Sequence, residues 1–163
     1  MKSRAPASTH KKVVVLLLDQ SVRKGYVNPS GLPAAESIDL LTPDGEHAAI
    51  KAADVKAVYF VEDLNRPYEP ERKAFLSRPK IEGLWLRLTF TDRDTLEGIT
   101  TNELLEILDR GIQLTPPDFH GNCSRIFIPR SALKEVKVLG VVGGAKRAPR
   151  PAPIPAQPGL FNE

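Results

Sequence analysis

The sequence predicts a mainly β protein of two tandem small five-stranded barrels, with a short helical connector between them and a disordered, proline-rich C-terminal tail. Three observations lead to this prediction. Short runs alternate apolar with polar residues between turn signals, as strands do. The spacing of these runs recurs once along the 163 residues. The final segment, 144–163, carries prolines at 149, 151, 153, 155 and 158, which favour extended, unpacked chain.

The first barrel is predicted over residues 13–63, after a flexible basic arm over 1–12. It opens with the apolar run 13–18, which the turn signal DQSVRKG follows. ESIDLLTP at 36–43 precedes a second turn signal, DGEH. AAIKAADVKAVYFVED at 48–63 then holds two apolar runs that KAAD separates. Strands joined by such tight turns are typical of a small closed barrel.

The connector is predicted over residues 64–83, where prolines at 67, 70 and 79 interrupt a charged stretch. A helical turn or two is expected at 70–77, because Pro70 suits an N-terminal helix position. Four basic side chains stand near aromatic ones and are candidates for an interaction surface: Arg66, Arg72, Lys73 and Arg78. Acidic residues among them favour a salt-bridged, solvated linker packed across both barrels.

The second barrel is predicted over residues 84–143. LWLRLTFTD at 84–92 alternates as a strand does, and TNELLEIL at 101–108 predicts a short helix or a strongly bent strand. Three further strands are expected in GIQLTPPD, SRIFIPR and LKEVKVLGVV.

The two barrels correspond residue by residue. IKAADVKAVYF at 50–60 has the spacing of the segment that begins IPRSALKEVKV at 128. The separation of corresponding residues changes only at turns, as expected for duplication of one unit. Matching pairs are Asp19 and Asp92, Gly25 and Gly98, Ile38 and Ile112, Ile50 and Ile128, and Val58 and Val136.

The motifs LLLDQSVRKG and LTFTDRDTLEG resemble the first motif of the Sm-like family, which includes bacterial Hfq, and IDLLTPDGEHAAIKAADVKAVYF is similar to its later strands. The resemblance covers roughly 13–61 and 84–140 and implies five-stranded Sm-like barrels. The family's usual glycine after the aspartate is replaced by Gln20 and Arg93. The turns KAAD and PRSA lack the Arg-Gly or Lys-His pairs with which Sm-like proteins contact RNA, so the resemblance implies the fold and not the ligand.

Charge and composition limit the partners. The chain carries a net charge of +3, but residues 13–143 hold 16 of the 23 basic and 19 of the 20 acidic side chains, so the body is mildly acidic. Nucleic acid would therefore be attracted through the two ends and the connector. The longest apolar run is too short for the roughly 20 residues of a membrane helix. No signal peptide is recognisable, and a single cysteine cannot form an internal disulfide, so a cytoplasmic location is predicted. No association with a membrane is expected.

No catalytic, cofactor or metal motif is recognised. DFHGNCSR places His120 and Cys123 in one loop, where a nucleophile pair is one interpretation and an idle thiol in a polar loop the other. His47 and His10 lie too far along the chain to complete a metal site by spacing. We therefore expect a protein that is not an enzyme and holds no cofactor.

The tail ends in QPGLF, which is similar to the bacterial motif that docks into the sliding clamp. Gln157, Leu160 and Phe161 would be its anchors. A short motif on an extended linker suits such docking, although Pro158 and Gly159 depart from the motif.

The favoured hypothesis is a non-enzymatic binding or adaptor protein whose surface is the groove between the barrels together with the connector, and whose partner is another protein. RNA or single-stranded nucleic-acid binding is the alternative, and association with a sliding clamp is a weaker one. The sequence leaves the oligomeric state open.

Overall fold

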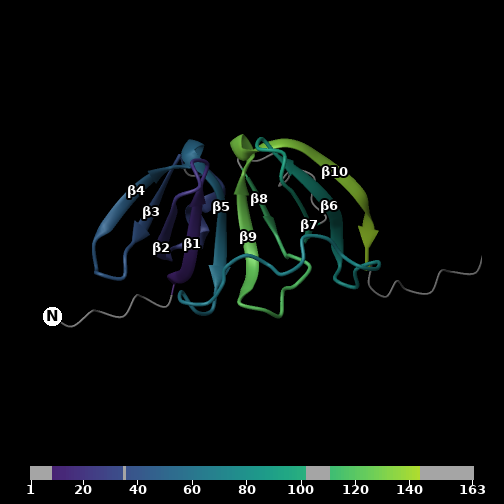
Figure 1. The fold of residues 1–163 in the computed structure, drawn as a ribbon, viewed down its shortest axis with the longest axis horizontal. Coiled ribbons are helices and arrows are strands. Elements are labelled where there is room, and N and C mark those ends of the chain that lie inside the picture. Colours follow the sequence, from purple (N-terminus) through teal and green to yellow (C-terminus); the bar gives the residue numbers. More distant parts are fainter. Residues whose placement is uncertain (1–8, 35, 102–110, 144–163) are drawn as a thin grey trace, which may run out of the picture.

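The computed structural model describes residues 9–34, 36–101 and 111–143 (Figure 1). The described chain is mainly β, as predicted: strands are its principal elements and its helices are short 3-10 turns. None of these helices is long and apolar enough to cross a membrane.

The first half of the molecule, residues 11–61, holds five antiparallel strands in the order β5-β1-β2-β3-β4. Two 3-10 helices interrupt them, η1 (Pro29–Ala34) and η2 (Ala52–Asp54). The strands are β1 (Lys11–Leu17), β2 (Val22–Val27), β3 (Ser37–Leu41), β4 (His47–Lys51) and β5 (Val55–Val61).

The second half, residues 83–142, arranges its strands in the same order. One sheet contains β10-β6-β7 and the other ends in β9-β8. Reciprocal hydrogen bonds of 3.0 and 2.8 Å between the backbones of Ile99 and Thr115 connect β7 to β8. The strands are β6 (Gly83–Phe90), β7 (Thr95–Thr100), β8 (Gly111–Leu114), β9 (Cys123–Pro129) and β10 (Leu133–Val142), with the 3-10 helix η3 (Arg130–Ala132) before β10.

The registers of the two halves also agree. Val13 lies opposite Gly25 across β1 and β2, and Leu86 lies opposite Gly98 across β6 and β7. The last strand of each half has a register shift at the same place, around Lys56 in β5 and around Lys134 in β10, and β10 has a second shift around Leu139. We call residues at the same place of corresponding strands counterparts.

The turn after each first strand explains one departure from the Sm-like pattern. Gln20 and Arg93 have φ angles of 76° and 75°, in the left-handed region where glycine is the least strained residue. In each turn an aspartate side chain accepts a hydrogen bond from a backbone amide two residues on, Asp19 from Ser21 and Asp92 from Asp94. This local bond helps a larger residue to hold the conformation.

The prediction of closed barrels is wrong. The described strands form a seven-stranded sheet in the order β4-β3-β2-β1-β5-β9-β8 and a separate three-stranded sheet. β5 uses its second edge to pair with β9 of the other half, with Val58 opposite Phe127 and Tyr59 opposite Ile126. Because β9 takes this edge, β5 does not close onto β4. Figure 1 shows β5 and β9 side by side at the centre of the molecule.

The predicted helical connector is also wrong. Residues 64–82 run through turns and bends without a helix. The 3-10 helix η1, which was not among the predicted elements, lies instead between β2 and β3. The helix or bent strand expected at 101–108, most of the basic arm and the proline-rich tail fall outside the described residues, apart from Thr101 and residues 9–12.

Two hydrophobic clusters form the core of the part of the chain that the structure describes, and β5 contributes to both. Val58 and Phe60 pack into the cluster of the first half, while Tyr59 on the opposite face packs into the cluster of the second half. Phe127 of β9 crosses in the other direction and joins the first cluster. Each such side chain, when fully buried, contributes about 1.5–3 kcal/mol. The halves therefore share their cores as well as a sheet.

Candidate binding site between the two halves

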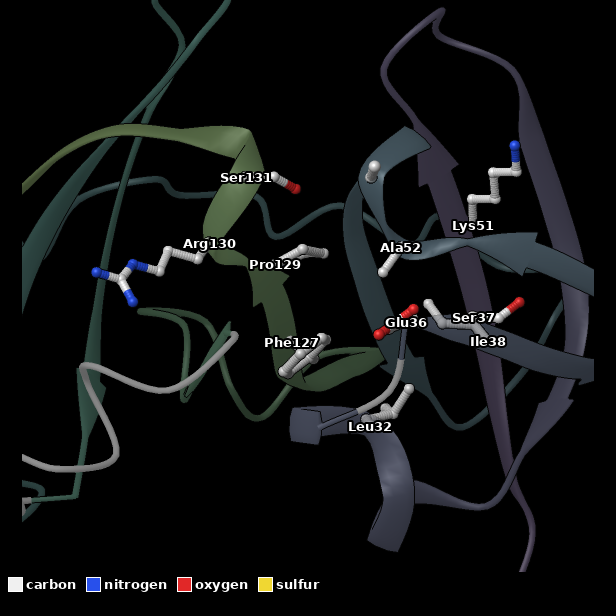
Figure 2. Close-up of a pocket in the computed structure, with 11 residues that line it drawn as sticks. Leu32, Glu36, Ser37, Ile38, Lys51, Ala52, Phe127, Pro129, Arg130 and Ser131 are labelled. Atoms are coloured by element: carbon white, nitrogen blue, oxygen red, sulfur yellow. The ribbon is translucent and has the colours of Figure 1, made fainter.

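A cleft with a volume of about 690 Å³ lies where the two halves meet (Figure 2). The first half contributes residues from η1, β3 and the β4–η2 turn, and the second half contributes the end of β9 and η3. The lining residues are Leu32, Glu36, Ser37, Ile38, Lys51, Ala52, Ala53, Phe127, Pro129, Arg130 and Ser131.

The two facing turns of the cleft are the KAAD and PRSA segments of the sequence. Lys51 and Pro129 are both extended, with φ and ψ of −67° and 131° and of −63° and 142°, and each leads into a 3-10 turn of three residues. The residues within these turns are mostly small, which lets the two turns lie close to each other. In Figure 2, Ala52 and Ser131 lie on opposite sides of the opening.

The floor of the cleft is apolar. Leu32, Ile38 and Phe127 are 4%, 2% and 2% exposed. Phe127 belongs to the second half in sequence but packs in the core of the first, because β9 pairs with β5. The cleft is thus supported by a rigid core, as binding pockets usually are.

Polar groups surround this floor unequally. Figure 2 shows the Glu36 carboxylate in the space between the halves, whereas the side chains of Lys51 and Arg130 extend away from it. The backbone oxygen of Glu36 accepts a hydrogen bond of 2.9 Å from the amide of Ala52, which ties the β3 end to η2. The centre of the cleft is therefore apolar with an acidic group, and its basic groups are peripheral.

An ion cluster around the buried side chain of Lys56 also joins the halves. The Nζ of Lys56 on β5 donates hydrogen bonds to Asp92 at 2.8 Å and Asp94 at 3.1 Å, in the turn between β6 and β7. It also lies 4.8 Å from the ring centre of Phe90. Burial disfavours the charged amine, but the two carboxylates outweigh it and raise the pKa of Lys56. The hydrogen bond from Lys56 lowers the pKa of Asp92.

The connector residues predicted to form an interaction surface lie along the second half. Lys73 forms an ion pair with Asp94 at 3.0 Å, and Arg78 donates a 2.7 Å hydrogen bond to the backbone oxygen of Val141. Arg66 and Arg72 are exposed. The basic residues thus contact separate elements, and two of them hold the connector in place.

Asn122 and two aromatic contacts fix the rest of the connector. The side-chain amide of Asn122 donates to the backbone oxygens of Asp63, Arg66 and Pro67. Tyr68 packs on Tyr59 with ring centres 5.0 Å apart. Phe75 meets Trp85 edge to face at 6.2 Å. The connector therefore packs as an ordered strap. The anchors proposed in the tail, Gln157, Leu160 and Phe161, lie outside the described residues.

The loop with His120 and Cys123 does not form an activated thiol. Cys123 is buried, and its Sγ donates to the backbone oxygen of Arg125 at 3.3 Å. Burial raises the pKa of the thiol to about 12, so the thiolate is scarce at neutral pH. The His120 ring packs against Phe119 at 4.0 Å. In the part of the chain that the structure describes, no group of three or more potential metal ligands comes together.

Comparison with known proteins gives a family. A family model described as a family of unknown function (DUF6982) matches residues 9–140. The chain belongs to this family. No curated protein and no solved structure matches it.

Sequence reasoning identified the groove between the halves but not the residues that line it. The four that define its character, Leu32, Glu36, Phe127 and Arg130, were not among the predicted sites. The recurrence of KAAD and PRSA at corresponding places was the available signal, because two copies of one turn meet across the junction. The contribution of η1 had a local signal that was not used, because NPSG at 28–31 is a turn-forming sequence in which the Asn28 side chain accepts a hydrogen bond from the amide of Ser30.

Proposed function

We propose that the protein is a non-enzymatic binding module that receives an apolar side chain of a protein partner in the cleft between its halves. The supporting observation is the cleft itself, which has a buried apolar floor and walls from both halves. Apolar anchor residues that fill such pockets supply most of the energy of many protein interfaces. A volume of about 690 Å³ accommodates one large anchor with its neighbouring backbone.

The charges favour a neutral or basic peptide segment over an acidic one. The Glu36 carboxylate lies in the middle of the opening, and Lys51 and Arg130 extend outwards (Figure 2). A phosphate placed over the floor would meet the carboxylate first. A basic side chain next to the apolar anchor would instead be attracted to Glu36, and this attraction would weaken with added salt.

We also propose that the halves are duplicated Sm-like units, opened at the junction and not closed individually. Agreement in strand order, in register and in the place of the register shift supports this interpretation. One unit of about 50 residues has little core of its own. Sharing β5 and Phe127 between the two cores offsets this weakness.

Nucleic-acid binding remains the alternative, because Lys51 and Arg130 stand at the rim of the same cleft. It predicts binding that weakens steeply with salt. Fluorescence anisotropy with pooled single-stranded RNA at low and at high salt measures this directly. Salt-dependent binding that is lost in the Lys51→Glu, Arg130→Glu double variant would favour RNA over a peptide.

The experiment for the peptide role is site-specific photo-crosslinking in the native host. A photoreactive amino acid replaces the exposed Ser131 at the cleft, and a matched chain carries it at Ser77, which is exposed on the connector. We expect a defined protein adduct from position 131 that is absent at position 77. Adding Ala53→Trp, which fills the opening, should abolish the adduct.

Three results would count against this role: no adduct at 131, equal adducts at both positions, or an adduct that survives Ala53→Trp. A turnover of any metabolite pool that Cys123→Ser abolishes would overturn the non-enzymatic assignment.

A further inference from the structure

Two strand edges of the described molecule have no neighbour. β4 ends the seven-stranded sheet on one side, and β10 ends the three-stranded sheet on the other. Both lie at the far ends of the molecule in Figure 1. Exposed edges present unpaired backbone groups and are suited to pairing with another strand.

The internal junction shows what each edge is built to meet. β10 occupies the place in the second half that β5 occupies in the first, and β4 occupies the place of β9. Inside the chain, β5 and β9 pair with each other. Their counterparts β10 and β4 are therefore a complementary pair of edges on opposite ends of one molecule.

Two apolar side chains of β10 are exposed where their counterparts on β5 are buried. Val136 and Val138 are the counterparts of Val58 and Phe60. The residues on β5 are 0% and 5% exposed, whereas Val136 and Val138 are 37% and 54% exposed. The difference arises because β9 covers β5 and no described strand covers β10.

The edge at β4 has a hollow of about 610 Å³. Its lining residues are Leu17, Leu18, Asp19, Arg23, Ala48, Ala49, Ile50, Lys51 and Asp54. At the corresponding place of the second half, Lys56 fills the space over Phe90 and binds Asp92. Leu17 and Asp19 are the counterparts of Phe90 and Asp92. The hollow therefore corresponds to the space that the Lys56 side chain fills in the second half. Among the described residues, no lysine of the same chain fills it.

The charges of the two edges are complementary. Lys134, the counterpart of Lys56, is exposed on β10, and Asp19 and Asp54 line the hollow. Beside it, Glu135 replaces Ala57. Arg23 in the hollow replaces Leu96, which shares a core cluster with Ala57. Two apolar side chains of one core cluster at the internal junction therefore correspond to an acid on one edge and a base on the other.

We propose that β10 of one copy pairs antiparallel with β4 of a second copy, repeating the β5–β9 junction between chains. The internal register places Val136 opposite Ala49 and Val138 opposite His47, and Lys134 enters the hollow to bind Asp19. The contact is head to tail, so each copy keeps a free β4 or β10 for the next one. Ala49 stands where Phe127 stands in the internal junction, which makes the contact between copies the weaker of the two.

The first test is the mass of the full-length protein by analytical ultracentrifugation over a range of concentrations. We expect species larger than the 17.9 kDa monomer that increase with concentration. Val138→Lys, which blocks β10, and Ala49→Arg, which blocks β4, should each abolish them. A wild-type protein that stays monomeric throughout would overturn the proposal, and this is also the result expected if the chain's own segment 144–163 covers either edge.

Mixing the two blocked variants separates a head-to-tail contact from a symmetric one. The Val138→Lys chain retains its β4 edge, and the Ala49→Arg chain retains its β10 edge. The mixture should therefore form a one-to-one dimer and nothing larger, while each variant alone is monomeric. Dimers of either variant alone would indicate a symmetric contact and would contradict the proposal.

Exchanging the two charges tests the proposed contact between Lys134 of one copy and Asp19 of the next. Lys134→Asp should weaken assembly at least tenfold, and the second change Asp19→Lys in the same chain should restore most of it. Failure of the double variant to assemble, with thermal unfolding unchanged from the wild type, would exclude the Lys134–Asp19 contact. The matched control is Lys80→Asp, an exposed change on the connector that should leave assembly unaltered.

Discussion

β5 and β10 hold the same place in their halves and differ in almost everything that surrounds them. Every residue of β5 is buried, because the strand has a neighbour at each edge and a core cluster on each face. Most of β10 is exposed, because β6 is the only described strand that pairs with it. The comparison teaches that strand order and register follow from the local sequence pattern. The contribution of a side chain to the free energy of unfolding depends instead on whether the other half of the molecule buries it.

The largest difference is expected between Phe60→Ala and Val138→Ala. Removing the buried ring should lower the free energy of unfolding by about 3–5 kcal/mol, because a cavity remains in the first cluster. The exposed valine at the corresponding place should cost less than about 0.5 kcal/mol. Urea unfolding followed by tryptophan fluorescence, at protein concentrations too low for assembly, measures both. Equal costs would mean that β10 is covered in the monomer.

A close approach in the second half gives the next effect. A Cβ at Gly98 of β7 would overlap the Leu114 side chain and come within 3.0 Å of the Thr115 backbone oxygen. Gly98→Ala should therefore cost about 1–3 kcal/mol through overpacking. The control is Gly140→Ala, since a Cβ there would meet nothing closer than 3.8 Å. Thermal unfolding compares them, and an unchanged midpoint for Gly98→Ala would contradict the tight β7–β8 contact.

The two lysines at the register shifts come third. Lys56→Ala leaves Asp92 and Asp94 without their buried partner and should cost about 2 kcal/mol, since hydrogen bonds to charged groups contribute about 1.5–3 kcal/mol. Its counterpart Lys134 is exposed, and Lys134→Ala should change stability by less than about 0.5 kcal/mol in the dilute monomer. Urea titration of both variants checks this. A larger cost at Lys134 would show that it has a buried partner within one chain.

Local patterns were sufficient to predict most of the strands. The turns at Asp19, Asp44 and Asp92 were recognisable because aspartate and glycine stabilise tight turns through local hydrogen bonds and left-handed φ angles. The partner of β5 was not predictable in this way. Closure onto β4 and pairing with β9 satisfy the same backbone groups, and only the tertiary structure shows that Phe127 completes the first core.

The candidate site was predictable only in outline for the same reason. The groove follows from placing two halves side by side, but its floor depends on Phe127 crossing the junction and on η1 supplying Leu32. The basic residues of the connector formed a clear sequence pattern, but they do not line the cleft. Lys73 and Arg78 bind the second half, because acidic and carbonyl oxygens of that half lie within reach.

At acidic pH, the ion pairs of Lys56 with Asp92 and Asp94 should stabilise the protein less. The hydrogen bond from Lys56 lowers the pKa of Asp92, and bonds from Lys73 and Lys56 outweigh burial to lower the pKa of Asp94. Groups with a lowered folded pKa stabilise the protein above their unfolded pKa, about 3.9, and lose this contribution as pH falls through the folded pKa.

The raised pKa of Lys56 has the opposite sign, so its contribution is complete below the unfolded pKa of about 10.4 and declines at higher pH. The stability difference between wild type and Lys56→Ala should therefore be constant from about pH 5 to 9 and shrink below about pH 4. Urea titrations across this range measure it. A difference that persists undiminished at pH 2 would assign the effect of Lys56 to packing on Phe90.

The smallest effect is expected for Lys73, which shares Asp94 with Lys56 but lies in solvent. Its side chain is 47% exposed, against 7% for Lys56. Water and salt screen such a pair, and exposed ion pairs contribute about 0.2–1 kcal/mol. Lys73→Ala should therefore cost less than about 1 kcal/mol, and 0.5 M salt should remove most of that cost while leaving more of the Lys56→Ala cost. If salt reduced both costs in the same proportion, the burial of Lys56 would not be what distinguishes the two lysines.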